Sequence, residues 1–270
     1  MNLYYLLAYF LLYSVLGWAL EVAYHVVKQG QVINRGFLNG PVCPIYGVGM
    51  VVVLVVLWPY SDHLVLLFLG GLIFATLIEL VGGFVLYKAF HMRWWDYSAE
   101  PYNLGGYICL RFSLAWGFCI VFAVDIIHPI VELNVYIMDG LLGHILVAVF
   151  CVLYVLDCVI TVLSIMNLNK DLKRMNAMAA ELRHFSDGLT EKIGARTFEA
   201  DAKVQAGRLQ ASLGKAELRD RLQAELKKIG KYRGLHQWVG YGRLTKAFPE
   251  LEHTLYNEEL LKIKEKLQKK

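Results

Sequence analysis

The first 166 residues of this 270-residue chain contain very little positive charge. They hold five Lys or Arg against nine Asp or Glu, whereas the rest of the chain holds twenty-two against fourteen. Hydrophobic residues make up 57% of the sequence, and many lie in runs that approach the roughly 20 residues needed to cross a bilayer. This pattern excludes a soluble globular protein. It predicts an apolar membrane domain, 1–166, and a basic cytoplasmic helical domain, 167–270.

Cysteine motifs that bind metal are also missing. The five cysteines form no CxxC pair and no Cys/His spacing typical of zinc sites. Their odd number and their position, mostly inside apolar runs, argue against a disulfide framework, so most should be small buried hydrophobic residues. Cys43 and Cys109 lie on loops and are the two candidates for reactivity or acylation. We therefore predict neither a metal site nor a cofactor.

The chain lacks the phosphate-binding loop of an ATPase. GxxxxGK[ST] is absent, and GLTEKIGARTFE has neither its spacing nor its lysine. The tail carries mixed charge and no recognisable nucleic-acid-binding module, so no nucleic-acid partner is expected. The N-terminus lacks the basic region of a signal peptide, and its apolar run is too long for one, which predicts a retained membrane helix.

Five apolar stretches predict an all-α polytopic bundle of about five transmembrane helices. They are residues 3–27, 42–58, 63–87, 107–127 and 141–166. Loops 28–41 and 88–111 contain Lys and Arg, whereas 59–62 and 128–140 contain none. By the positive-inside rule this alternation places the N-terminus outside and the C-terminus in the cytoplasm. Segment 128–140 is too short to span and should form either an outward-facing interfacial turn or a re-entrant segment.

At two places a glutamate inside an apolar run is followed fourteen positions later by an arginine. These pairs are Glu21 with Arg35 and Glu79 with Arg93, fifty-eight residues apart. A charged side chain inside a bilayer costs about 3 kcal/mol or more unless it is paired or lines a polar cavity. The repetition suggests a duplicated hairpin with a polar site between its copies, as occurs in transporters with parallel repeats. The alternative is that two buried ion pairs merely hold helices together.

Three acidic residues should lie at a common depth on three parallel helices. Glu21, Glu79 and Asp157 each precede the cytoplasmic end of their span by a similar number of residues, which corresponds to about 10–14 Å of helix. Each belongs to a polar helical stripe, and such stripes also occur in ordinary helix packing. The stripes are Ser14, Trp18, Glu21 and His25; Thr76, Glu79 and Gly82 or Gly83; and Tyr154, Asp157, Thr161 and Ser164. His25 is more readily explained as an interfacial or hydrogen-bonded residue than as a ligand.

The two cytoplasmic loops combine arginine with aromatic and turn-forming residues. Their arginines could pair with the glutamates, snorkel to the interface, determine topology, or bind a phosphate or carboxylate. The tryptophans could form an interfacial belt or stack on a ligand. The predicted polar cavity is lined by Glu21, Arg35, Glu79, Arg93, Trp94, Trp95, Asp96, Asn103, Arg111 and Asp157, with its loops shaped by Gly36, Gly40, Pro41, Cys43, Pro44, Gly47 and Gly105. We expect Arg35, Trp94, Trp95 and Asp96 to surround one cavity that opens to the cytoplasm, with Glu21 and Glu79 as its floor.

Long motifs in these loops resemble a known family. NRGFLNGPVCPIYG, RWWDYS, PYNLGGYICL and LAWG, with RLTKAFPELEH in the tail, are similar to the bacterial family of putative ABC-transporter type IV permeases. The resemblance covers nearly the whole chain and implies a multi-pass protein of the bacterial plasma membrane without identifying a substrate. The matched positions are Asn34, Arg35, Gly36, Gly40, Pro41, Cys43, Pro44, Tyr46, Gly47, Trp94, Trp95, Asp96, Tyr97, Asn103, Gly105, Cys109 and Leu110.

Three functions are compatible with these patterns. The favoured one is a membrane transport protein, a permease subunit with a polar cytoplasm-facing site between the first and third spans. The second is a scaffold or sensor that acts through its tail. The third, less favoured, is a membrane-embedded enzyme on a lipid or isoprenoid phosphate, with Arg35 and Arg93 as phosphate ligands and Asp96 or a glutamate as base. The expected partners are the lipid bilayer and a separate ATPase or other subunit.

The tail sequence predicts amphipathic helices over 171–185, 199–231 and 257–270. Their use would be a helical hairpin or coiled coil, for a partner or for self-association. Their basic excess also favours contact with anionic cytoplasmic lipid.

Overall fold

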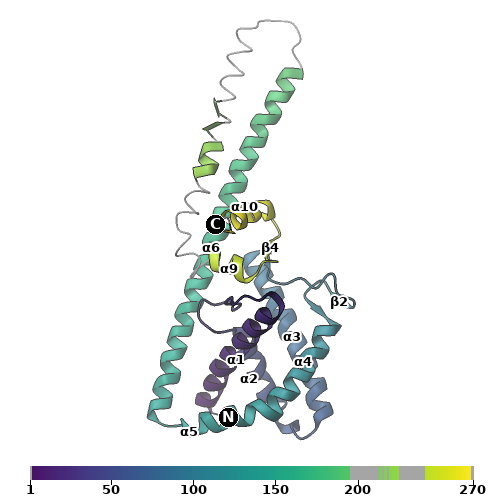
Figure 1. The fold of residues 1–270 in the computed structure, drawn as a ribbon, viewed down its shortest axis with the longest axis vertical. Helices are drawn as coiled ribbons and strands as arrows, with labels where there is room; N and C mark the ends of the chain where they lie inside the picture. The colour runs from purple at the N-terminus through teal and green to yellow at the C-terminus, as the bar shows by residue number, and fades with distance from the viewer. Residues whose placement is uncertain (1, 195–212, 215, 218, 225–240, 269–270) are drawn as a thin grey trace.

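The computed structural model describes residues 2–194, 213–214, 216–217, 219–224 and 241–268 (Figure 1). The helices are α1 (Leu3–Gln29), α2 (Pro44–Val56), the 3₁₀ turn η1 (Trp58–Tyr60), α3 (Leu64–Phe90), α4 (Leu110–Phe122), the π-helical turn η2 (Ala123–Ile127), α5 (His128–Ile137), α6 (Leu141–Gly194), α9 (Tyr241–Ala247) and α10 (Asn257–Gln268). The strands are β1 (Met92–Arg93), β2 (Asn103–Leu104), β3 (Ile108–Cys109) and β4 (Glu252–His253).

The predicted all-helical membrane bundle is confirmed. Four helices are long and apolar enough to cross a membrane: Leu3–Lys28, Leu64–Phe90, Leu110–Ile137 and Leu141–Leu182. The remaining predicted span, 42–58, contains the 13-residue apolar helix α2. Its first helical residue is Pro44, where the missing backbone N–H costs nothing because that donor has no partner inside a helix.

Helix ends place the loops that matter for the site. Gly30 ends α1 in the left-handed conformation, with φ of 69°, and its N–H donates to the carbonyl of Val26 at 2.8 Å. His91 ends α3 in the same conformation, with φ of 55°. The C-terminal ends of α1 and α3 both lie at the end of the bundle that faces α9 and α10, whereas the N-terminus lies at the opposite end (Figure 1). The two loops with the repeated Glu–Arg spacing are therefore neighbours in space.

The segment 128–140 is mostly helical, and its position at the interface or as a re-entrant segment stays a prediction. The chain continues from α4 through the π turn η2 into α5. Pro129 lies at the start of α5, and a proline clashes with the carbonyl four residues before it in a regular α-helix. The wider π turn directly before it relieves that clash and lets the helix continue. α5 then packs across the start of α1, where Tyr4 donates to the carbonyl of Val135 at 3.3 Å.

The last helix of the bundle does not stop where the apolar sequence ends. α6 runs for 54 residues, about 80 Å at 1.5 Å per residue, and passes residue 166 without a break. The membrane part and the start of the tail therefore share one helix. The proposed division into domains at 166 stays a prediction.

Two groups of buried side chains form the core. One group lies toward the N-terminal end of α1, where Tyr4, Tyr9 and Tyr13 pack against α2, α4 and α5. The other lies where the tail meets the bundle and joins Phe90, Met92 and Trp94 to α6, α9 and α10, through Ile165, Leu168, Leu172, Met175, Leu244, Leu251, Leu260 and Ile263. The C-terminal segment is therefore packed onto the bundle.

A short antiparallel pairing strengthens this attachment. β1 pairs with β4, with Met92 opposite His253 and Arg93 opposite Glu252. The N–H and hydroxyl of Thr254 both donate to the carbonyl of His91, at 3.0 and 3.1 Å. The predicted tail helix at 257–270 corresponds to α10. Most of the helix predicted at 199–231 lies outside the described residues, as does any coiled coil it would form.

Candidate functional site

The loop after α1 is held from α6 by Asp157. One carboxylate oxygen accepts hydrogen bonds from the N–H and side-chain amide of Asn39, at 3.1 and 2.8 Å. The other accepts from the N–H of Gly40 at 2.7 Å. A Cβ atom at Gly40 would lie 3.2 Å from this oxygen, so a side chain there would crowd the contact. Asp157 therefore fixes the turn that leads into α2.

Arg243 of α9 also binds this loop. Its guanidinium donates to the carbonyls of Gly36 and Phe37, at 2.8 and 2.7 Å, and to the side-chain oxygen of Asn39 at 3.2 Å. The residue is only 5% exposed. Burial lowers the pKa of Arg243 to about 10, which leaves it cationic at neutral pH. The loop is thus clamped between a carboxylate and a guanidinium that lie far apart in the sequence.

Glu21 forms one half of a second polar group, between α1 and α2. The hydroxyl of Tyr46 donates to its carboxylate at 2.6 Å, and the Nε atom of Arg35 lies 3.9 Å away as an ion pair. Both charged side chains are about three-quarters buried. His25, one turn further along α1, is buried, and its Nε2 has no hydrogen-bond partner in the described part of the chain.

Glu79 of α3 forms the other half. Its side chain is 7% exposed, and the hydroxyl of Tyr97 donates to Oε1 at 2.9 Å. The indole of Trp116 on α4 interacts with the same carboxyl group, but Oε2 has no partner of normal hydrogen-bond geometry among the described residues. Glu21 and Glu79 are close enough for their charges to repel each other. The rings of Tyr46 and Trp116 are also in contact, with centroids 5.6 Å apart. These interactions join the two halves into one carboxylate cluster: Glu21, Arg35, Tyr46, Glu79, Tyr97 and Trp116.

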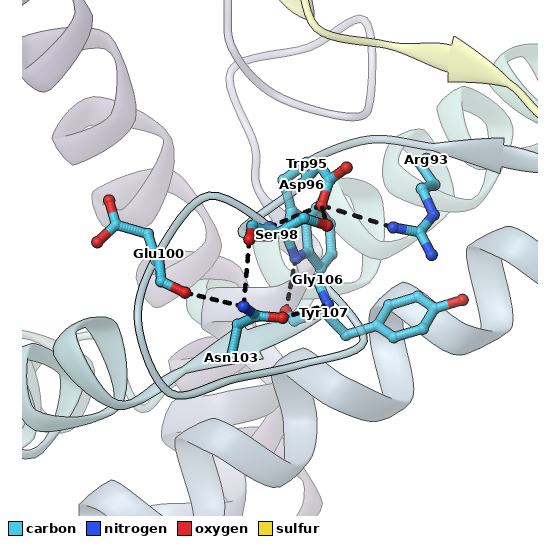
Figure 2. Close-up of polar contacts among 8 residues, drawn as sticks. All are labelled: Arg93, Trp95, Asp96, Ser98, Glu100, Asn103, Gly106 and Tyr107. Carbon is cyan, nitrogen blue, oxygen red and sulfur yellow. Dashed lines mark hydrogen bonds and ion pairs between the residues drawn. The ribbon is translucent and has the colours of Figure 1, made fainter.

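The second loop is a compact turn around Asp96 (Figure 2). Asp96 accepts hydrogen bonds from the N–H and hydroxyl of Ser98, and Arg93 lies 3.5 Å from the same oxygen. The Ser98 hydroxyl, more than Arg93, lowers the pKa of Asp96. Gly106 has φ of +74° and faces this oxygen, so a side chain there would collide with it. Asp96 therefore organises the turn.

Asn103 and Trp95 complete this turn. The amide of Asn103 donates to the carbonyl of Glu100 at 2.8 Å, and its oxygen accepts from the N–H of Gly106 at 3.1 Å. The indole of Trp95 donates to the carbonyl of Tyr107 at 2.9 Å, and its ring lies against Gly83 of α3. The turn is thereby attached to the helix that carries Glu79.

The structure brings together some of the predicted site residues and separates others. Glu21, Arg35 and Glu79 belong to the carboxylate cluster. Arg93 pairs with Asp96 instead of Glu79, because Asp96 follows it by only three residues in the same short turn. Arg111, a mostly exposed side chain, pairs with Glu100 at 3.3 Å. Asp157 binds the backbone of the loop after α1. With Arg243 it forms the clamp on that loop, rather than a part of the carboxylate cluster.

Trp94 also has a different environment from the one predicted. It is 5% exposed and packs edge-on against Phe37 and Phe248, each with ring centroids 5.0 Å apart. These contacts belong to the core between the bundle and the tail. Trp94 therefore attaches the C-terminal segment, whereas its neighbour Trp95 faces α3.

The predicted loop-shaping residues lie at close approaches of backbone. A Cβ at Gly36 would be 2.8 Å from the carbonyl of Val42, and one at Gly47 would be 2.2 Å from the hydroxyl of Ser14. The N–H of Cys43 donates to the carbonyl of Ser14 at 2.8 Å. Gly105 adopts φ of +60°. Pro41 and Pro44 frame the entry into α2.

Sequence reasoning missed three residues that make these sites: Asn39 and Trp116 as partners of the acidic side chains, and Arg243 as the clamp. Tyr46 and Tyr97 were noticed only as parts of motifs. The signal was present, since Tyr46, Tyr97 and Trp116 lie in the motifs PIYG, RWWDYS and LAWG and Arg243 opens RLTKAFPELEH. Among the described residues, no group of three or more His, Cys, Asp or Glu could hold a metal ion.

Comparison with known proteins identifies a family. The family described as "Putative ABC-transporter type IV" matches residues 8–162, which is more than half of the chain. The chain belongs to this family. Comparison with curated proteins and with solved structures found no match. The matched region runs from within α1 to within α6 and contains both loops that carry the acidic and aromatic residues of the site.

Proposed function

We propose that this chain is a permease subunit whose solute path passes the carboxylate cluster between α1 and α3. One observation carries the proposal: Glu79 lies inside an apolar spanning helix, is 7% exposed, and has one carboxylate oxygen without a hydrogen-bond partner among the described residues. A purely structural carboxylate at such a place would be expected to have its charge paired and its oxygens satisfied. Ionisable residues inside membranes usually mark solute or ion pathways.

The surroundings of Glu79 also support a solute path past the carboxylate cluster. The cluster draws its residues from α1, α2, α3, α4 and both loops, so the site lies where these four helices meet. Two of these residues, Glu21 and Arg35, form an ion pair, whereas Glu79 has none with the residues that the structure describes. Membership of an ABC-transporter family fits a transport role. Since the chain has no ATPase motif, the energy would come from a separate ATPase subunit or from ion coupling.

The proposal can be tested in inverted membrane vesicles from the native cell, which retain any partner ATPase. Vesicles with and without this protein are loaded by exposure to the small-molecule fraction of a cell extract, with and without ATP, and their content is read by mass spectrometry. We expect at least one solute whose accumulation needs the protein and falls at least tenfold in both Glu21→Gln and Glu79→Gln. Glu132→Gln, the same change at an exposed carboxylate, is the matched control.

A scaffold function is the second candidate, because α6 extends far past the bundle and the tail segment is clamped by Arg243. In that case Glu21→Gln and Glu79→Gln would leave activity intact, whereas Arg243→Ala would abolish it. The enzyme reading has weaker support. Asp96 is held by Ser98 and Arg93, and its lowered pKa makes it a poor general base at neutral pH.

A further inference from the structure

In the described part of α3, a carboxylate oxygen and a hydroxyl group are buried without a hydrogen-bond partner. Glu79 Oε2 and Thr76 Oγ1 are both buried, and neither has a hydrogen-bond partner in the described parts of the chain. They stand three residues apart, which places them on one face of the helix. Buried polar groups in native proteins nearly always have a partner, so two such groups side by side point to a bound species.

The hydroxyl donors of the two cluster tyrosines are already used. Tyr46 donates to Glu21 and Tyr97 donates to Glu79. A ligand that satisfies the free carboxylate oxygen must therefore bring its own N–H or O–H groups. A ligand with only acceptors, such as a phosphate or a carboxylate, would leave Glu79 unsatisfied and repelled.

The net charge of the cluster favours a ligand of opposite charge. Arg35 pairs with Glu21, so these two charges balance. Glu79 has no ion-pair partner among the described residues, and Glu21 is close enough for its negative charge to repel it. The cluster therefore carries one uncompensated negative charge when Glu79 is ionised, next to the rings of Tyr46 and Trp116, whose faces attract cations.

We propose that the carboxylate cluster binds the primary ammonium group of an organic amine. An ammonium carries one positive charge and three N–H donors, which matches one free carboxylate oxygen, one free hydroxyl oxygen and aromatic rings. A bare metal cation fits less well, because such ions take six or more oxygen ligands and the described residues offer no group of three metal-ligating side chains. This inference rests on the proposed function and names the substrate class of that site.

The test measures the thermal stability of the purified full-length protein in detergent, with n-butylammonium chloride as the probe. We expect n-butylammonium to raise Tm, whereas butanol, sodium chloride and potassium chloride at the same concentrations leave it unchanged. Tetramethylammonium, which has the charge but no N–H donor, should give a smaller rise. A ligand that binds only the folded state stabilises it by mass action.

Variants decide whether the rise comes from this site. In Glu79→Gln the apparent affinity for n-butylammonium should fall at least tenfold, in Thr76→Val it should fall by less, and in Glu132→Gln it should stay as in the wild type. Melting of each variant without ligand shows that it is folded; if Glu79→Gln does not fold, Thr76→Val and the tetramethylammonium comparison decide. No rise, an equal rise in Glu79→Gln, or an equal rise with the metal chlorides would overturn the inference.

The two proposals fail separately. Binding of n-butylammonium at Glu79 without any protein-dependent flux in vesicles would reject the permease role and keep the ligand class. Flux of a solute without an amino group that depends on Glu79 would keep the permease role and reject the ammonium ligand.

Discussion

Arg243 shows how one side chain can join parts of the chain that lie more than 200 residues apart. Its forked donors meet two carbonyls and a side-chain amide in the loop after α1, at 2.7 to 3.2 Å. Asp157 meets the N–H groups of the same loop. A lysine could supply the charge but not the planar, multidentate geometry.

We expect Arg243→Ala to release the C-terminal segment from the bundle. The change leaves buried carbonyls without a hydrogen-bond donor. The free energy of opening this segment should therefore fall by on the order of 3 kcal/mol. Arg243→Lys should recover only part of this loss. Hydrogen exchange of residues 34–40 and 241–268 measures the effect. Lys246→Ala, at an exposed position of the same helix, should change nothing, and an equal effect there would reject the clamp.

His253 should make the attachment of the tail depend on pH. It is 2% exposed, and its Nδ1 accepts from the N–H groups of Leu255 and Tyr256, both at 3.1 Å. Burial, with a smaller contribution from His91, lowers the pKa of His253 from 6.5 to about 4. The neutral form therefore favours docking: its contribution is complete above pH 6.5 and is lost as the pH falls toward 4.

Hydrogen exchange of residues 252–268, corrected for the intrinsic effect of pH, should show weaker protection as the pH falls from about 7 to about 5. His253→Asn keeps an acceptor that does not titrate in this range, so it should flatten the dependence. The same pH dependence in this variant would show that another group is responsible.

At the scale of elements, α2 depends on close contact with α1. A Cβ at Gly47 would lie 2.2 Å from the hydroxyl of Ser14 and 2.4 Å from the carbonyl of Phe10. One at Gly49, on the same helix, would meet nothing within 4 Å. Small residues allow helices in membranes to approach closely, and packing replaces the hydrophobic force that drives association in water. This contact also positions Tyr46, one residue before Gly47, against Glu21.

Gly47→Ala should therefore destabilise the bundle, and Gly49→Ala should not. Overpacking costs about 1–3 kcal/mol, whereas alanine in an unobstructed helix position gains up to about 1 kcal/mol over glycine. Thermal melting of the two variants in one detergent compares them directly. Equal stability of the two proteins would show that α1 and α2 are less tightly packed than the structure indicates.

At the scale of the whole molecule, the bundle places the two loops and the C-terminal segment at one end and the N-terminus at the other (Figure 1). The loops at the tail end and the helix ends beside them contain all the Lys and Arg of the first 166 residues. The positive-inside rule therefore predicts that this end, with Arg35, Asp96 and Arg243, faces the cytoplasm.

Cysteine labelling in whole cells tests this orientation. In a background in which the native cysteines are replaced, a membrane-impermeant maleimide should reach single cysteines at positions 62 and 132 from outside. Cysteines at 35, 96 and 200 should react only after the membrane is opened. Labelling of position 96 in intact cells would reverse the orientation and place the carboxylate cluster on the outer side.

The sequence alone determined that the chain is a helical membrane protein, where the apolar helices begin, and that Glu21 and Glu79 are unusual. Hydrophobic runs and turn residues are local, and a bilayer leaves few structures for such runs. Only the tertiary structure decided the partners: Tyr97 for Glu79, Asp96 for Arg93, and Arg243 for the first loop. It also decided that residues 128–137 continue a helix. Equal spacing of Glu and Arg along the chain does not determine these contacts, because they depend on which helices pack together and on turns only a few residues long.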